Sequence, residues 1–173
     1  MLKMFSTQLT GLFKRLQEKE EYSIEDGARL LAQAAAGQGK IYLCGQREMQ
    51  AIGLEAVYGE EPLQSAAILT EDTDLEAADR VLMVSRYSDD SEAVRVARNL
   101  QEKGIPFVAI STVRGEMDVE GLDNLADVHI DLRMTKGLLP DELGNRVGFP
   151  TSMAALFIYF GLKFTIEEIL EEY

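Results

Sequence analysis

Two arginines stand where a chain of this pattern could bind an anion. Arg47 lies in residues 45–48 and Arg86 in residues 85–92, and each segment follows a predicted buried strand and precedes a predicted helix. Helix N-termini present free N–H groups and partial positive charge, and a guanidinium can hold an anion through two hydrogen bonds. Both arginines could instead pair with carboxylates of these same segments, Glu48 and Asp89, so anion binding and internal pairing are both open.

The other groups that could do chemistry are few. His129 is the single histidine and falls within a predicted strand, which rules out a multi-histidine metal site in one subunit. We predict no metal and no cofactor. Cys44, at the end of a predicted buried strand, fits a small core residue, or a thiol activated by a nearby helix N-terminus. A buried Glu55 or Glu142 could act as a base, although nothing in the sequence singles out either one.

The composition excludes several partners. The chain has 17 Lys and Arg against 30 Asp and Glu among 173 residues, a formal net charge of −13. Nucleic acid and anionic membrane surfaces are bound by dense basic patches, so neither is expected as a partner. The single cysteine allows no intramolecular disulfide, and the N-terminus has no continuous apolar signal segment. We therefore expect a cytoplasmic protein.

Short β-rich runs alternate with helical segments through the middle of the chain. This alternation predicts βαβ units and a five-stranded parallel sheet in a three-layer α/β/α sandwich. We expect the flavodoxin-like strand order 2-1-3-4-5 for this sheet. Ligands bind such sheets beyond the carboxyl ends of the strands, where the strand order reverses. That point lies between strands one and three and contains both arginine segments. The expected strands cover residues 40–44, 65–69, 80–85, 106–111 and 128–132.

The N-terminal segment predicts two helices. Over residues 1–20 the apolar residues are spaced three and four apart, which is typical of a helix that packs on another helix. This helix could cover its own domain or contact a second subunit. A further helix is expected from Ser23 to the glycines at 37 and 39.

The C-terminal part differs in character. Residues 133–148 predict a long loop whose Arg133, Lys136 and Arg146 could add to an anion site. A helix over residues 151–172 follows, apolar on all sides between 153 and 162, with a capping box at Thr165 for its last turns. Such a helix is buried in the core or in an oligomer interface. With the first helix, it predicts a homodimer or higher homo-oligomer of one domain, residues 1–173.

The third predicted strand and the segments after it resemble the sugar isomerase (SIS) domain. That family reads roughly D-x-hydrophobic-S-x-S-G-x-[ST], a helix, and then G-hydrophobic-x-hydrophobic-I-T. Residues 79–92, residues 104–112 and Leu125-Ala126-Asp127 follow this series. The chain looks most similar to an uncharacterised bacterial SIS-like family labelled phosphoheptose isomerase. The resemblance implies phosphosugar binding, with hydroxyls and helix amides holding the phosphate, and it carries over to Ser85, Ser88 and Ser91.

The sequence departs from the family pattern at the two loops. One extra residue separates Ser85 from Ser88, and Asp89 replaces the family's glycine. The first loop, usually G-x-G-x-S, reads Gly45-Gln46-Arg47-Glu48-Met49, so its serine is missing. Carboxylates at Glu48, Asp89 and Asp90 would repel a phosphate dianion.

Three functions therefore remain open. The first is an SIS-type binder of a carbohydrate derivative, a sugar phosphate or related anion. The second is a phosphosugar aldose–ketose isomerase. The third is a degenerate, non-catalytic SIS-like dimer with a regulatory or structural role. For the ligand site we predict Gly45, Gln46, Arg47, Ser85, Arg86, Ser88 and Ser91.

Overall fold

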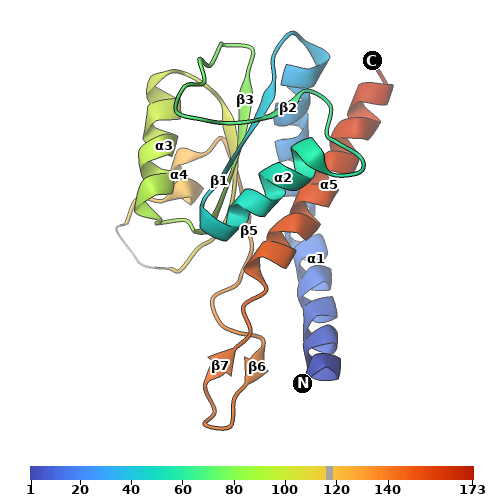
Figure 1. Cartoon of the computed structure of the whole chain (residues 1–173), viewed down its shortest axis with the longest axis vertical. Coiled ribbons are helices and arrows are strands. Elements are labelled where there is room, and N and C mark those ends of the chain that lie inside the picture. Colours follow the sequence, from blue (N-terminus) through green and yellow to red (C-terminus); the bar gives the residue numbers. More distant parts are fainter. Residues whose placement is uncertain (116–118) are drawn as a thin grey trace.

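A computed structural model describes residues 1–115 and 119–173 as a three-layer α/β/α sandwich (Figure 1). Its central sheet has five parallel strands in the order β2-β1-β3-β4-β5, which confirms the predicted 2-1-3-4-5 order. The expected strand positions hold to within two residues. The strands are β1 (Ile41–Gly45), β2 (Ala66–Ile68), β3 (Arg80–Tyr87), β4 (Phe107–Thr112) and β5 (Val128–Asp131).

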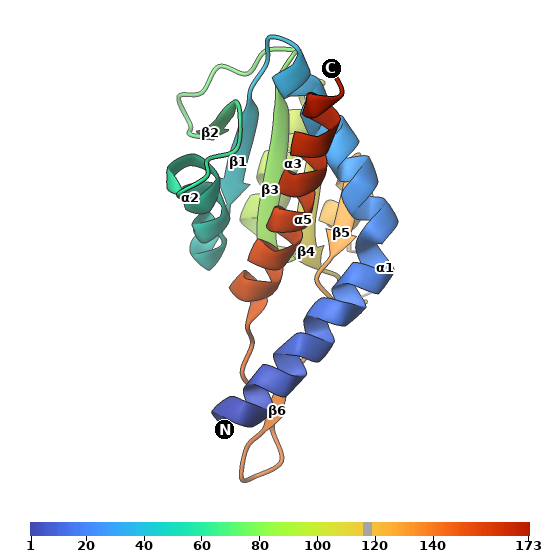
Figure 2. The same cartoon turned by 90° about the vertical axis from the view of Figure 1, so that its right-hand side faces the viewer.

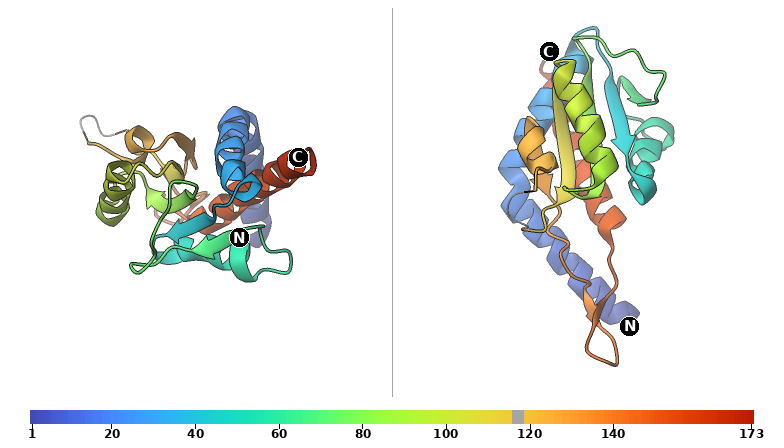
Figure 3. Two further views of the ribbon diagram at one scale, coloured as in Figure 1. Left: turned by 90° about the horizontal axis from the view of Figure 1, so that it is seen from above. Right: turned by 90° about the vertical axis from the view of Figure 1, so that its left-hand side faces the viewer.

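The strands are buried on both faces because helices cover both sides of the sheet. Every residue of β4 is buried, as expected for a parallel strand with a near-continuous apolar sequence. One core lies between the sheet and α1, α2 and α5, and a second lies between the sheet and α3 and α4 (Figure 3). The helices are α1 (Leu2–Ala36), α2 (Gln50–Tyr58), α3 (Ser91–Glu102), α4 (Leu122–Leu125) and α5 (Thr151–Glu171), with a 3₁₀ turn, η1 (Arg47–Met49), before α2.

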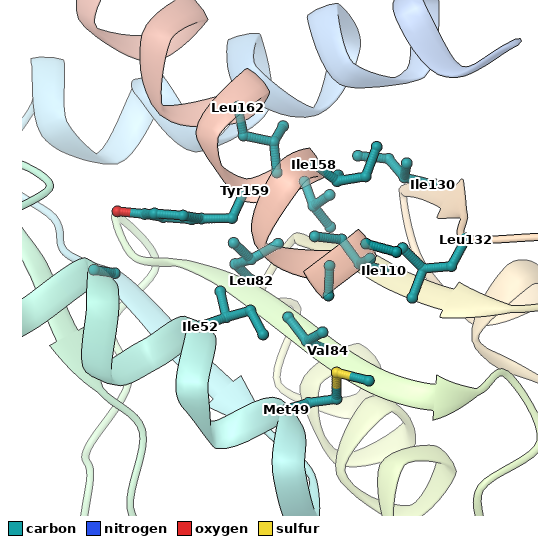
Figure 4. Packing of buried hydrophobic residues seen from close by; sticks show 14 of the residues in the cluster. Met49, Ile52, Leu82, Val84, Ile110, Ile130, Leu132, Ile158, Tyr159 and Leu162 are labelled. Atoms are coloured by element: carbon teal, nitrogen blue, oxygen red, sulfur yellow. The ribbon is translucent and has the colours of Figure 1, made fainter. Parts of the chain in front are cut away.

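The larger core is built around α5. Ile158, Tyr159 and Leu162 of α5 pack over β3, while Met49 and Ile52 reach the same cluster from η1 and α2 (Figure 4). The two clusters hold the helices against the two faces of the sheet, and the loops follow at the strand ends.

The N-terminal segment is one helix, so the predicted start of a second helix at Ser23 is wrong. α1 runs unbroken for 35 residues, with Ser23 inside it. Its second half lies against the sheet, where Gly27 permits a close approach: a Cβ there would lie 3.2 Å from Val108 and from Leu162. The helix continues across Ser23 because its apolar face has partners along its whole length. The second half of the helix packs on the sheet and α5, and the first half contacts residues that extend beyond the sheet.

The C-terminal part contains two further corrections. The predicted loop at 133–148 includes a two-stranded antiparallel hairpin, β6 (Leu139–Pro140) and β7 (Arg146–Val147). α5 runs through the predicted cap at Thr165, whose hydroxyl donates instead to the Gly161 carbonyl at 2.9 Å. The hairpin lies beside the N-terminal half of α1, and both extend past the carboxyl edge of the sheet (Figure 2).

Candidate functional site

The carboxyl ends of β1 and β3 form the switch point of the sheet. The two strands are hydrogen-bonded neighbours, yet the chain leaves β1 for α2 on one face and leaves β3 for α3 on the other. Two loops that part in this way leave a crevice at the strand ends. All seven predicted site residues lie in or beside these two loops.

The first loop turns sharply after β1. A Cβ on Gly45 would lie 2.2 Å from the Met49 carbonyl oxygen, so only glycine fits this turn. The backbone N–H of Gln46 donates to the Val84 carbonyl at 2.9 Å and ties the loop to β3. The side chain of Gln46 turns back to the Cys44 sulfur at 3.7 Å. Gln46 thus shapes the loop with its backbone while its carboxamide faces away from the crevice.

Arg47 keeps a backbone conformation suited to glycine. Its φ is 51°, in the left-handed region, and it occupies the position of the second glycine in the G-x-G-x-S pattern. Its side chain is exposed and, among the described residues, forms no ion pair. Met49, which replaces the serine of that pattern, is fully buried. The turn of the loop is therefore retained, while its hydroxyl is exchanged for a core side chain.

The second loop begins with a β-bulge. Val84 pairs with Ile110 and Tyr87 with Thr112, so β3 carries one more residue than β4 between these pairs. The bulge accommodates the extra residue between Ser85 and Ser88. Ser85 is fully buried, and its hydroxyl has no hydrogen-bond partner within the described part of the chain.

Arg86 joins the two loops. Its Nε donates to Oε1 of Glu48 at 2.7 Å, and the side chains are 45% and 35% exposed. This hydrogen bond is the main reason why the pKa of Glu48 lies below its usual value and the pKa of Arg86 above its own. Of the two readings left open for Arg86, internal pairing with Glu48 is the one that the structure shows.

Asp89 pairs with an arginine that the sequence reasoning missed. Nη2 of Arg114 lies 2.7 Å from both Asp89 oxygens, and the guanidinium lies over the Tyr87 ring, 4.1 Å from its centroid. Arg114 follows β4, so it stands at the carboxyl edge like the two segments examined from sequence. Its position three residues beyond a predicted strand was the signal that could have found it.

The N-terminus of α3 is closed by a carboxylate of the chain. Asp90 is the N-cap, and its Oδ1 accepts the Ala93 N–H at 3.0 Å. Ser88 is buried at 5% exposure and Ser91 is the exposed first residue of the helix. Neither serine caps the helix. The cap is Asp90 because its acceptor oxygen reaches the N3 amide of the helix.

Two of the three basic residues of the late segment have structural partners, while Lys136 is exposed. Nε and Nη2 of Arg133 lie 3.0 and 2.7 Å from Oε1 of Glu20, a buried carboxylate of α1. Arg146 donates to the carbonyls of Gly137 and Leu138 within the hairpin. These two arginines hold α1 and the hairpin in place, which accounts for them without an added anion site.

The acid–base candidates do not gather at the crevice. Burial raises the pKa of the Cys44 thiol to about 11, which opposes a reactive thiolate. The Nε2 of His129 lies 2.7 Å from the Ser111 hydroxyl, and burial lowers the pKa of the ring. Glu55 lies on α2 and Glu142 is exposed in the hairpin turn. Over residues 1–115 and 119–173, no three His, Cys, Asp or Glu side chains are placed to hold a metal ion.

A family model described as a domain of unknown function, DUF2529, matches residues 1–170. The chain belongs to this family. The uncharacterized protein YwjG of Bacillus subtilis (strain 168) is 45% identical over 174 residues, covering 100% of this chain and 99% of the relative.

Solved structures of other proteins share the fold of this DUF2529 protein. A phosphoheptose isomerase from Francisella tularensis has a TM-score of 0.64 at 15% identity, over 95% of this chain and 94% of that chain. The Vibrio vulnificus NanR protein complexed with ManNAc-6P has a TM-score of 0.63 at 14% identity, over 97% and 61%. The sugar isomerase domain of an RpiR transcription factor from Sphaerobacter thermophilus has a TM-score of 0.58 at 14% identity, over 99% and 96%.

These likenesses establish an SIS-type fold for the chain. They do not extend the phosphoheptose isomerase label to it. No helix in the described residues has the length and apolar character needed to cross a membrane.

Proposed function

We propose that the protein binds a carbohydrate derivative that carries a phosphate or similar anion at the carboxyl edge of its sheet. The site would consist of Gly45, Gln46, Arg47, Ser85, Arg86, Ser88 and Ser91. The observation that carries this proposal is the position of Arg86, on a bulge at the switch point and half exposed to solvent. The fold is shared with a protein complexed with ManNAc-6P, which supports a sugar phosphate as the ligand class.

The pairing of Arg86 defines how a ligand would enter. An exposed ion pair contributes only about 0.2–1 kcal/mol, because water competes for both charges. A phosphate that offers two oxygens to the guanidinium can therefore displace Glu48 at small cost. Arg47 forms no ion pair among the described residues, so it would supply a second positive charge from the opposite loop without breaking an existing contact. The binding site is then closed by Glu48 in the free protein and opened by the ligand.

Binding without catalysis is favoured by the state of the carboxylate in the crevice. A general base for isomerisation is tuned upward in pKa, toward neutral pH. Glu48 is shifted the other way by its hydrogen bond from Arg86. An aldose–ketose isomerase remains the alternative, and its base would have to be a group other than Glu48.

The third candidate is a degenerate, non-catalytic SIS-like dimer with a regulatory or structural role that does not bind the anion, and two observations favour it. Asp90 accepts the hydrogen bond of an amide at the start of α3, and Asp89 is paired with Arg114, so carboxylates lie where an anion would bind.

We also propose a homodimer, since Phe149, Met153 and Phe164 at α5 remain 42–53% exposed.

A panel of sugar phosphates separates these functions. We expect at least one aldose or ketose phosphate to raise the melting temperature of the protein, while the matching unphosphorylated sugar at the same concentration gives a smaller shift. Conversion of that sugar phosphate, followed by NMR, would show isomerase activity. A panel with no shift in any member would favour the non-binding role.

A further inference from the structure

A cavity lies on the α3 side of the sheet, beside β1, and reaches the carboxyl end of that strand at Gly45. It has a volume of about 630 Å³ and is bounded by β1, the N-terminal part of α2, residues 69–75 and α3. Its origin is topological. The chain passes from β2 to β3 through residues 69–79 without a helix, and α3 packs over β3 and β4, so this face of β1 and β2 lacks a covering helix.

Apolar and polar side chains share the lining of this cavity. Cys44, Leu69, Leu75 and Leu100 form an aliphatic wall that continues the smaller core. Three residues with carboxamide side chains also line it: Gln46 after β1, Gln50 at the start of α2 and Asn99 on α3. A carboxamide both donates and accepts hydrogen bonds, which matches hydroxyl groups and uncharged polar atoms.

The charges at the cavity cancel. Arg95 donates to both carboxylate oxygens of Glu92, at 3.0 and 2.5 Å, so this pair neutralises itself. Glu71 and Lys103 add one charge of each sign. The lining of the cavity therefore carries no net charge, although the chain as a whole has a net charge of −13. By itself the lining favours neither an anion nor a cation. Its volume is within the range of small-molecule sites, which are mostly apolar with a few placed polar groups.

We propose that this cavity is a second small-molecule site, for an uncharged, hydroxyl-bearing ring compound of the size of a free monosaccharide. The C–H face of the ring would rest on the wall at Leu69 and Leu75. Its hydroxyls would meet the carboxamides of Gln50 and Asn99. The site goes beyond the proposed function, because it requires neither Arg86 nor a phosphate. The cavity and the proposed anion site share Gly45 and Gln46, so a ligand in either one would contact the same loop.

The test is a titration of ¹⁵N-labelled full-length protein with free glucose, N-acetylglucosamine and inositol, followed by NMR. We expect at least one of them to shift the side-chain amide signals of Gln50 and Asn99 in a saturable manner. Asn99→Ala should weaken that binding about three- to tenfold, the worth of one neutral hydrogen bond. Gln64→Ala, an exposed amide outside the cavity, is the matched control and should leave the affinity unchanged, as should Arg86→Ala.

A second measurement uses the single cysteine, Cys44, which lines the cavity. A bound sugar should slow its modification by a thiol reagent. The proposal is overturned if none of the three compounds shifts the amide signals, or if Asn99→Ala and Gln64→Ala behave alike. It is also overturned if only phosphorylated sugars act and Arg86→Ala abolishes the effect, since the cavity would then belong to the carboxyl-edge site. If no sugar phosphate binds at the carboxyl edge but a free sugar still shifts the amide signals, the proposed function fails and the cavity proposal holds.

Discussion

The guanidinium of Arg86 on β3 donates a 2.7 Å hydrogen bond to the carboxylate of Glu48 in the loop after β1. This contact spans the switch point of the sheet and links the two loops that part there. It gives the crevice its electrostatic character, because the cation best placed for a ligand is held by an anion of the chain. The proposed ligand would therefore have to take the place of Glu48 at Arg86.

Removing the competing carboxylate should strengthen anion binding. Glu48→Gln keeps the side-chain shape but leaves Arg86 without a charged partner, so we expect the affinity for a sugar phosphate to rise about two- to fivefold. That range corresponds to an exposed ion pair worth about 0.5–1 kcal/mol. Isothermal titration measures it. Glu120→Gln, which removes the partner of Arg98 elsewhere on the surface, is the control. An unchanged or lower affinity in Glu48→Gln would mean that the pair does not compete with the ligand.

The cap of α3 should be measurable as stability. Asp90→Ala removes the acceptor for the Ala93 N–H, and we expect the free energy of unfolding to fall by about 0.5–2 kcal/mol. Asp90→Asn retains an acceptor oxygen and should lose less than half of that. Urea unfolding provides the comparison. Equal losses in the two variants would show that the charge, and not the hydrogen bond, supports the helix.

His129 should make stability depend on pH in one direction. Burial holds its folded pKa below the unfolded value, although Asp131 and Asp123 oppose this shift. The unfolded state therefore binds more protons, and stability falls as the pH drops below about 6.5 until the folded pKa is passed. We expect the wild type to lose more stability between pH 7.5 and 5.5 than His129→Gln in urea unfolding. An equal loss would assign the pH dependence to carboxylates alone.

Assembly should depend on the exposed apolar residues at α5. The triple variant Phe149→Ser, Met153→Ser and Phe164→Ser removes apolar side chains from solvent-facing positions, so its own fold should persist. We expect the wild type to sediment as a dimer of 19.2 kDa chains and the variant as a monomer. A monomeric wild type at micromolar concentration would contradict the dimer.

The strand pattern predicted the sheet because buried parallel strands carry an apolar signature that is local in sequence. β4 and β5 were located in this way, and the structure has the flavodoxin-like strand order that we expected for such a sheet. The continuity of α1 across Ser23 could not be predicted from the local sequence, because a serine is compatible with both the start and the interior of a helix.

The partners of the site residues depend on tertiary contacts that sequence spacing does not encode. Glu48 and Arg86 are 38 positions apart, and Asp89 and Arg114 are 25 apart, so neither pair forms a local pattern. The extra residue between Ser85 and Ser88 was visible in the sequence, but its absorption by a bulge became clear only from the pairing of β3 with β4.

The proposed anion site around Arg86 is tested most directly by titrating the wild type and Arg86→Ala with the sugar phosphate that gives the largest thermal shift. Arg98→Ala, an exposed ion-paired arginine of α3, is the control. We expect Arg86→Ala to weaken binding at least tenfold, the loss of a charge-assisted hydrogen bond, while Arg98→Ala binds like the wild type. Equal affinities in the wild type and Arg86→Ala, or no binding by the wild type, would contradict it.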